Sequence, residues 1–177
     1  MSVELAALGA ALAAIGSILV YTLRTGITPM PTSRRVKAAM IELVPDGFEG
    51  TIVELGSGWG TLAMAFARRY PGCQVLAYEL SPLPWLFSRL WCAVAPLANL
   101  RVHRADFHEA RLHGAGLVVC YLHPGAMERL RPKLEAELTP GALVLSNTFA
   151  MPRWRPVAVA EAEDFYRSKV YLYRIAA

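Results

Sequence analysis

The sequence predicts an α/β fold: a mostly parallel sheet with helices on both faces, closed by an antiparallel hairpin and preceded by a membrane-spanning helix. Three observations lead to this expectation. Residues 5–23 carry no charged side chain, strand and helix patterns alternate over residues 32–149, and two strand-like runs follow near the C-terminus. Alternating strands and helices are typical of a parallel sheet whose connections cover both of its faces.

The apolar stretch at residues 5–23 is the first expected element. At helical rise, its uncharged length of about 19 residues spans close to the hydrocarbon core of a bilayer. A secretory signal peptide would need a basic leader and a small-residue cleavage site, whereas Glu4 is the only charge before this stretch. A retained transmembrane anchor is therefore favoured over a cleaved signal or a buried helix of a soluble domain.

Basic residues follow the apolar stretch at once, namely Arg24, Arg34, Arg35 and Lys37. Because basic residues beside a membrane helix tend to stay cytoplasmic, we expect a single-pass protein of the inner (cytoplasmic) membrane with a cytoplasmic domain. The three cysteines are widely spaced and fit neither a disulfide framework nor a zinc cluster. The chain is thus divided into an anchor at residues 1–24, a linker at residues 25–31 and one domain at residues 32–177.

The segments after the linker alternate. Residues 32–44 have apolar side chains at helical spacing, and Thr32 or Ser33 is placed to cap that helix. Strands are expected at residues 51–55, 73–80, 99–105, 116–122 and 141–149, and further helices at 61–70, 83–95 and 126–138.

The tail breaks this rhythm. Residues 156–164 and 168–176 are strand-like and leave no room for a helix between them, which predicts an antiparallel hairpin. Five parallel strands and a terminal hairpin form the Rossmann-like layout of class I methyltransferases, which use S-adenosylmethionine.

The stretch ELGSGWG, residues 54–60, places three glycines at alternate positions between a strand and a helix. Gly56, Gly58 and Gly60 allow a sharp turn that presents bare amides to a ligand at the helix N-terminus. A dinucleotide fingerprint has the spacing G-x-G-x-x-G. Here the spacing is G-x-G-x-G after Glu54, the form found where a cofactor presents an amino acid end, so S-adenosylmethionine is favoured.

Two further acids follow strand ends. Glu79 ends the second strand, where it can accept hydrogen bonds from ribose hydroxyls, and Asp106 follows the third, where such enzymes place an acid near the adenine amino group. A solvated acid at a strand end is the alternative for each. The predicted cofactor-binding residues are Thr32, Glu54, Gly56, Ser57, Gly58, Gly60, Glu79, Leu80, Asp106 and Phe107.

Several motifs together resemble one family. They are TPMPTSRRV, ELGSGWG, YELSP, LEAELTPGALVLSNTF and FAMPRWRPV. With the anchor before them, they are similar to the membrane-anchored protein-lysine methyltransferases whose mitochondrial members modify the ATP synthase c subunit and the adenine nucleotide translocase. The resemblance implies methyl transfer to a lysine of a membrane protein. The family often has an acid where Trp59 stands, so an aromatic wall is expected here in place of a polar contact or helix cap.

Lysine methylation indicates where catalytic residues are to be sought. A lysine amine, with a reference pKa of about 10.4, must lose its proton before it attacks. We expect the acceptor where the fourth and fifth strands end, which makes Tyr121, His123 and Asn147 the candidates. For His123 a position at the rim of the site is the alternative. The sequence YLHP there replaces the N-P-P-Y type signature of many enzymes that methylate planar nitrogens, which argues against DNA adenine or glutamine substrates.

Metal and nucleic acid are not favoured as partners. His103, His108 and His113 lie five residues apart, a spacing that fits no single face of a helix or strand, so no metal is expected. The net charge of +4 is spread along the chain without a basic run interleaved with aromatics, so no nucleic acid is expected. Anionic lipid heads are the simpler partner for the basic segment beside the bilayer.

Three functions from different classes stay open. The leading one is a protein-lysine methyltransferase acting on a membrane protein with an accessible lysine near the cytoplasmic surface. The second is a methyltransferase for a lipid or other small molecule held at the membrane, which would need a deep apolar pocket. The third is a membrane-bound regulator that binds the cofactor without transferring its methyl group.

Overall fold

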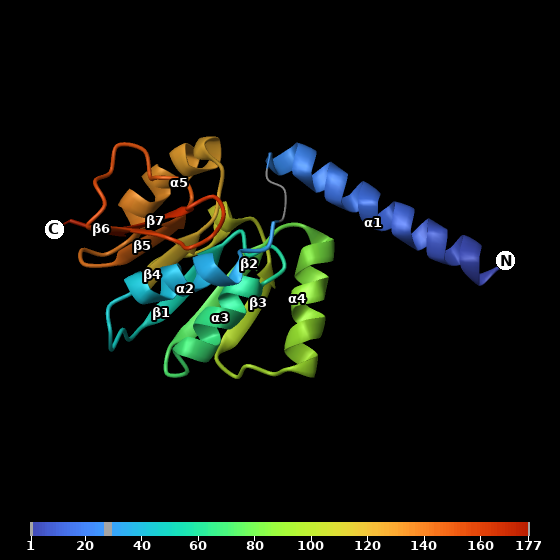
Figure 1. Cartoon of the computed structure of the whole chain (residues 1–177), viewed down its shortest axis with the longest axis horizontal. Helices are drawn as coiled ribbons and strands as arrows, with labels where there is room; N and C mark the ends of the chain where they lie inside the picture. Colours follow the sequence, from blue (N-terminus) through green and yellow to red (C-terminus); the bar gives the residue numbers. More distant parts are fainter. Residues whose placement is uncertain (1, 27–29, 177) are drawn as a thin grey trace.

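The computed structural model describes residues 2–26 and 30–176. In these ranges a long N-terminal helix leads into a seven-stranded sheet with helices on both faces (Figure 1). Residues 1, 27–29 and 177 lie outside the described part. Residues 27–29 are the central three residues of the predicted linker, and residues 28 and 29 begin the TPMPTS motif, so these parts of the prediction lie outside the described residues.

The observed elements follow the predicted order. The helices are α1 (Val3–Thr25), α2 (Arg34–Leu43), α3 (Thr61–Arg69), α4 (Pro82–Val94) and α5 (Pro124–Glu137), with a 3-10 helix η1 at Phe107–Glu109. The strands are β1 (Thr51–Leu55), β2 (Gln74–Glu79), β3 (Leu100–Arg104), β4 (Ala115–Cys120), β5 (Leu143–Asn147), β6 (Ala158–Glu161) and β7 (Lys169–Arg174). Ser33 caps α2, because its side chain accepts a hydrogen bond from the amide of Val36 at 3.3 Å.

The sheet has the strand order β3-β2-β1-β4-β5-β7-β6. Strands β1 to β5 are parallel, β7 is antiparallel to β5, and β6 is antiparallel to β7. The predicted Rossmann-like sheet with a terminal antiparallel pair is therefore confirmed. In this order β1 and β4 lie side by side at the centre, where the crossovers change direction, and such a switch point is where open α/β sheets bind ligands.

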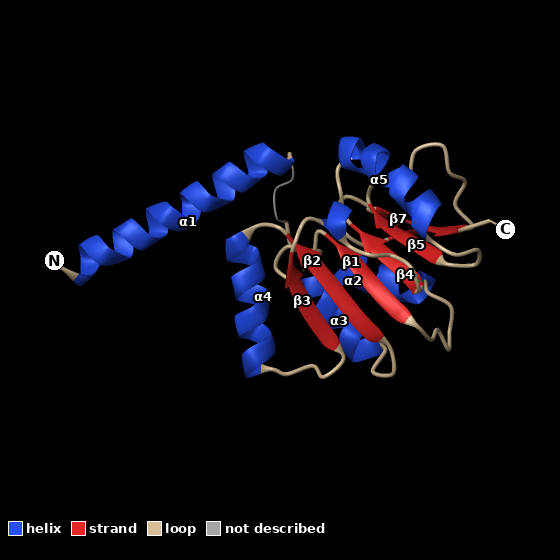
Figure 2. Ribbon diagram, turned by 180° about the vertical axis from the view of Figure 1, so that it is seen from behind, coloured by secondary structure: helices blue, strands red, loops and turns tan. Residues whose placement is uncertain are grey.

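Helices cover both faces of the sheet (Figure 2), and an apolar core lies between the sheet and the helices on each face. On one face, Ile52 of β1 belongs to a core with Met40 of α2 and Phe66 of α3. On the other face, the next residue, Val53, packs in a core with Leu130 of α5. Because successive side chains of a strand point to opposite faces, a strand buried on both sides reads as a continuous apolar run, as TIVEL does.

Helix α1 stands apart from these layers. None of its 23 residues is buried, and its mean hydropathy reaches 2.1. By length and composition it is the one helix within residues 2–26 and 30–176 that could cross a bilayer. It ends at Gly26, whose left-handed backbone (φ 69°) terminates the helix, and it packs against α4.

Candidate active site

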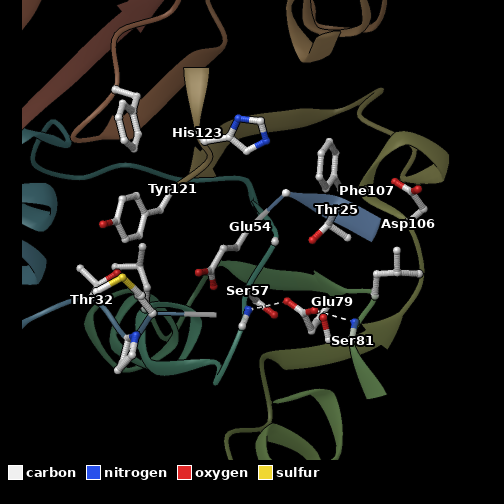
Figure 3. A pocket seen from close by; sticks show the side chains of 18 of the residues that line it. Thr25, Thr32, Glu54, Ser57, Glu79, Ser81, Asp106, Phe107, Tyr121 and His123 are labelled. Carbon is white, nitrogen blue, oxygen red and sulfur yellow. Dashed lines mark hydrogen bonds between the residues drawn. The ribbon is translucent and has the colours of Figure 1, made fainter. Parts of the chain in front are cut away.

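A cavity of about 750 Å³ lies at the carboxyl ends of the central strands (Figure 3). This volume is within the range of about 300–1,000 Å³ that is usual for ligand sites. One end is lined by the glycine turn after β1 and by the residues that follow β2 and β3. Tyr121 and His123, which follow β4, line it as well, and Figure 3 shows Tyr121 on the side opposite Phe107 and Asp106, with His123 between them.

The glycine turn has the left-handed backbone that its sequence requires. The φ angles of Gly56, Gly58 and Gly60 are 74°, 52° and 71°. The amides of Gly56 and Ser57 both donate to the carbonyl oxygen of Tyr78, at 3.0 and 2.9 Å. A Cβ atom on Gly60 would approach Ser88 Oγ to 2.6 Å. The turn is thus held between β2 and α4 and admits no side chain at this glycine.

Glu79 fixes the turn from the neighbouring strand. Its carboxylate is buried and accepts hydrogen bonds from the amide of Gly58 at 2.7 Å and from the amide of Ser81 at 2.6 Å. Each oxygen therefore has one main-chain donor and retains the capacity to accept another hydrogen bond. A ribose hydroxyl is a donor of the required kind.

Glu54, at the end of β1, is the opposite case. It is equally buried, but its Oε2 atom has no hydrogen-bond partner among the described residues. The pKa of this carboxyl is raised to about 8, mainly by desolvation and to a smaller extent by the nearby charge of Glu79, while a hydrogen bond from the amide of Ala63 opposes the shift. Ser57 Oγ is also buried without a partner. Two unpartnered polar atoms beside a glycine turn fit the amino acid end of S-adenosylmethionine.

Asp106 and Phe107 form the far wall beyond β3. Asp106 Oδ1 accepts a hydrogen bond from the amide of His108 at 2.9 Å and so caps η1. The ring of Phe107 lies 4.5 Å from that of His108. This places an acid and an aromatic ring together at the end of the cavity where an adenine base is expected.

Nine of the ten predicted cofactor-binding residues line this cavity. They are Thr32, Glu54, Gly56, Ser57, Gly58, Glu79, Leu80, Asp106 and Phe107. Gly60 is not among the described lining residues and instead shapes the turn from behind, as the residue before α3.

The three predicted catalytic residues do not all line the cavity. His123 Nε2 is buried without a partner among the described residues, and Tyr121 stacks at 6.4 Å on Phe149, which also lines the cavity. Asn147 is not among the described lining residues. It is 2% exposed, and its Oδ1 atom accepts a hydrogen bond from Thr148 Oγ1 at 2.9 Å. The geometry therefore leaves Tyr121 and His123 as the candidates that reach the cavity.

Several lining residues were not predicted from the sequence. Arg24, Thr25 and Gly26, at the end of α1, line the cavity, and a Cβ atom on Gly26 would lie 3.3 Å from His123 Nε2. Met30 and Pro31 line it as well, and the TPMPTS motif was the available signal for them. The ring of Trp59 packs edge-on at 5.4 Å against Phe87 of α4 and is not among the described lining residues, so its aromatic contact is with a helix.

No group of three or more His, Cys, Asp or Glu side chains that could hold a metal ion is gathered in the described part of the chain.

Comparisons with known proteins identify relatives. Residues 54–158 match the family described as the ANTKMT methyltransferase domain. The chain is 38% identical over 117 residues to the adenine nucleotide translocase lysine N-methyltransferase of Mus musculus, covering 64% of this chain and 49% of that protein. It is 28% identical over 153 residues to a protein-lysine N-methyltransferase of Saccharolobus islandicus, covering 82% of this chain and 92% of that protein. The chain thus spans about half the length of the mouse relative.

A solved structure agrees with these matches. The crystal structure of an RNA methyltransferase from Salinibacter ruber, in complex with S-adenosyl-L-homocysteine, superposes with a TM-score of 0.72 at 30% identity, covering 83% of this chain and 94% of that chain. S-adenosyl-L-homocysteine is what S-adenosylmethionine becomes when its methyl group has been transferred. With the family match extending over more than half of its residues, this chain belongs to the ANTKMT methyltransferase domain family, and S-adenosylmethionine is its cofactor.

Proposed function

We propose that this chain is a protein-lysine N-methyltransferase that acts on a membrane or membrane-associated protein near the cytoplasmic surface. The observation that carries the proposal is the similarity to curated protein-lysine N-methyltransferases, one of which, from Saccharolobus islandicus, is matched over 92% of its length. The two-ended cavity supports it, because one end suits the cofactor and the other leaves room for an acceptor.

At the cofactor end, each acid has a distinct task. Glu79 is already positioned by two main-chain amides and would accept hydrogen bonds from the ribose hydroxyls. Glu54 would take the amino group through its unpartnered oxygen, and Asp106 would lie beside the adenine. When bound, the cofactor supplies a methyl group carried on a sulfonium centre. Thr32, Ser57, Leu80 and Phe107 would enclose it.

At the acceptor end, the protein must align a lysine amine with that methyl group and exclude water, and positioning of this kind contributes several kcal/mol. The amine must also lose its proton. In this proposal His123 Nε2, which has no partner among the described residues, would accept it directly or through a water, and the aromatic rings of Tyr121 and Phe149 would hold the aliphatic part of the lysine.

Helix α1 supplies the membrane association in this proposal. Its apolar length supports a single span, and Arg24, Arg34, Arg35 and Lys37 favour a cytoplasmic domain. Confinement of enzyme and target to one surface raises their effective concentration without a new contact. A variant lacking residues 2–20 but keeping Tyr21 to Gly26 should therefore methylate a soluble target peptide normally and a target in intact membranes much less.

The proposal is tested by the destination of the methyl group. Purified full-length protein is incubated with S-adenosylmethionine labelled in its methyl group and with membranes of the source cells. The proposal is supported if the label is found in methyl-lysine of a protein fraction and is lost from that fraction after protease digestion. Label that organic solvent extracts as lipid would favour the small-molecule alternative, and cofactor binding in calorimetry without turnover on any fraction would favour the regulator.

A second candidate is methylation of RNA, favoured by the relative from Salinibacter ruber at 30% identity. The residues that follow β4 differ from the signature of many enzymes that methylate planar nitrogens, and this difference argues against methylation of RNA bases. The same experiment, repeated with total RNA and a nuclease digestion, decides between them.

A further inference from the structure

The outward face of α4 is apolar over its full length. Leu86, Phe87, Leu90, Trp91 and Val94 are between 44% and 86% exposed and recur at helical spacing, opposite the buried Pro84 and Ser88. Arg89 is the only charged residue of this helix. By contrast, α5, on the other side of the sheet, carries a dense pattern of acidic and basic side chains. A helix that covers a water-exposed domain is expected to look like α5.

The aromatic rings on this face are packed together. Phe87 lies between Trp59 and Trp91, with ring centroids 5.4 and 6.2 Å apart. The guanidinium of Arg89 lies 5.9 Å from the ring centroid of Trp85, at the edge of the face. Aromatic rings bordered by basic side chains are typical of surfaces that lie at the level of lipid headgroups.

The position of α4 relative to α1 makes this face continuous with the proposed span. Helix α1 packs against α4, and its partly covered residues, including Ala14, Ile18 and Tyr21, all lie in its C-terminal half. Ile18 is about 10 Å along the helix from Thr25 at 1.5 Å per residue. If Arg24 marks the headgroup level, the covered residues lie from about 5 Å (Tyr21) to about 15 Å (Ala14) along the helix from that level, so α4 contacts the part of α1 that enters the hydrocarbon.

Figures 1 and 2 show how α4 is oriented relative to α1. In both views α4 runs crosswise to α1, at the edge of the domain from which α1 projects. A membrane crossed by α1 would therefore run along the outward face of α4. We infer that this face lies in the bilayer interface, so that the domain is held to the membrane by an interfacial helix as well as by its anchor. This inference rests on the proposed anchoring by α1.

A second membrane contact would have a functional consequence. A single span leaves the tilt of the domain relative to the membrane open, whereas a second contact along α4 would fix that tilt. The cavity, lined by Arg24 to Gly26 at the end of α1, would then be held close to the headgroups. The acceptor lysine is accordingly expected within a short distance of the membrane surface.

Spin labels on single cysteines test the inference in the full chain. Cys92, the half-exposed native cysteine, is first replaced by serine, while Cys73 and Cys120 are buried. Labels are placed at Leu90→Cys and Val94→Cys in protein reconstituted in vesicles of phosphatidylcholine and phosphatidylglycerol. We expect collisions with oxygen to exceed collisions with a nickel chelate severalfold at both positions.

Two control sites separate the possible outcomes. Phe165→Cys replaces an exposed aromatic residue in the connection between β6 and β7, which lie at the opposite end of the sheet from β3 and α4, and its label should be accessible to water. Leu12→Cys reports the anchor itself. If the labels at Leu90 and Val94 collide mainly with the nickel chelate while the label at Leu12 collides mainly with oxygen, the inference is overturned and the anchor is retained. Water at all sites would overturn the anchoring as well. Protection from both agents at Leu90 would indicate a protein neighbour and would also overturn it.

A functional measurement complements the labels. Leu90→Glu places a charge on the outward face of α4, and its matched control is Phe165→Glu. The α4 variant should lose methylation of the target in membranes about tenfold and keep its activity on a soluble peptide, whereas the control should keep both. Equal activity of the two variants on membranes would contradict the inference.

Discussion

Glu54 and Glu79 end neighbouring parallel strands, are buried to the same degree and line the same cavity, yet their surroundings are opposite. Glu79 accepts two main-chain amide hydrogen bonds, whereas one oxygen of Glu54 has no partner among the described residues. Glu79 is therefore part of the folded scaffold before any ligand arrives. Glu54 is kept in an unfavourable environment that a ligand donor can relieve. Burial alone does not distinguish the two roles, but the hydrogen-bond partners do.

The comparison leads to predictions that are ordered by their expected effect on cofactor affinity, with one on the pH dependence of stability beside that for Glu54. The largest concerns Gly58, whose amide joins the turn to Glu79. Gly58→Val places a β-branched side chain at a φ of 52° and fills the space beside the cavity. We expect cofactor affinity to fall more than about a hundredfold and stability to fall by about 1–3 kcal/mol, the usual magnitude for such strain.

The matched control is Gly47→Val. Gly47 also has a left-handed backbone, with φ 70°, but a Cβ atom there meets no atom within 4 Å, and the residue precedes β1, whereas the cavity lies beyond the carboxyl end of that strand. This variant should show the stability loss without the loss of binding. Calorimetric titration and thermal unfolding measure both quantities. Normal cofactor binding by Gly58→Val would mean that the turn is structural only.

The second prediction removes the scaffold acid. Glu79→Ala eliminates the proposed ribose acceptor and leaves the amides of Gly58 and Ser81 without their partner. Loss of hydrogen bonds to a charged acceptor weakens binding by about 1.5–3 kcal/mol, roughly ten- to 150-fold. Stability should fall as well, because the amides become unsatisfied. Glu79→Gln keeps one acceptor oxygen, so its cofactor affinity and its stability should lie between those of the unchanged protein and those of Glu79→Ala. Unchanged affinity in calorimetry would remove Glu79 from the cofactor site.

The third prediction concerns the unpartnered acid. Glu54→Gln should weaken cofactor binding at neutral pH by about tenfold or less, because a charged hydrogen bond is exchanged for a neutral one. In contrast with the Glu79 variants, it should not destabilise the free protein. A variant that loses stability at pH 7 would show that Glu54 has a structural partner in addition to the amide of Ala63.

The pH dependence of stability sharpens this contrast. The folded pKa of Glu54, about 8, lies above the ordinary value of 4.5, so the folded state binds more protons than the unfolded chain between these pH values. The free energy of unfolding therefore decreases as pH rises through this window, by a few kcal/mol at most. Glu54→Gln should lack this decrease. Urea unfolding at pH 5 and pH 9, without cofactor, checks it, and identical pH slopes would refute the assignment.

These results show what the sequence could and could not reveal. The elements were predictable because buried strands are short apolar runs and helices have apolar side chains at helical spacing. The glycine turn, Glu79 and Asp106 could be placed together because the carboxyl ends of parallel strands meet at one edge of a sheet. The hydrogen bonds that distinguish Glu54 from Glu79 depend on side-chain directions within a turn, which no spacing encodes.

Two parts of the site were beyond such reasoning. The approach of Gly26 to His123 joins residues almost a hundred positions apart and depends on the direction in which α1 leaves the domain. Asn147 was chosen as a strand end, but β7 pairs alongside it and its side chain accepts a hydrogen bond from Thr148. A strand end next to an antiparallel neighbour is thus less open than one at the switch point.

The last prediction concerns the acceptor end and leaves cofactor affinity unchanged. His123 precedes α5, and its side chain makes no capping hydrogen bond. Because asparagine is among the best residues at this position, His123→Asn should preserve the helix while it removes the imidazole. If His123 accepts the lysine proton, kcat falls about a hundredfold, within the usual range for a general base. Tyr121→Phe, which keeps the stacked ring, should change kcat less than threefold. Calorimetry should give the same cofactor affinity for both variants, because their contribution begins only after the cofactor is bound. An unaltered kcat in His123→Asn would assign His123 to the rim, and proton loss would then be left to solvent and to the desolvation of the amine within the cavity.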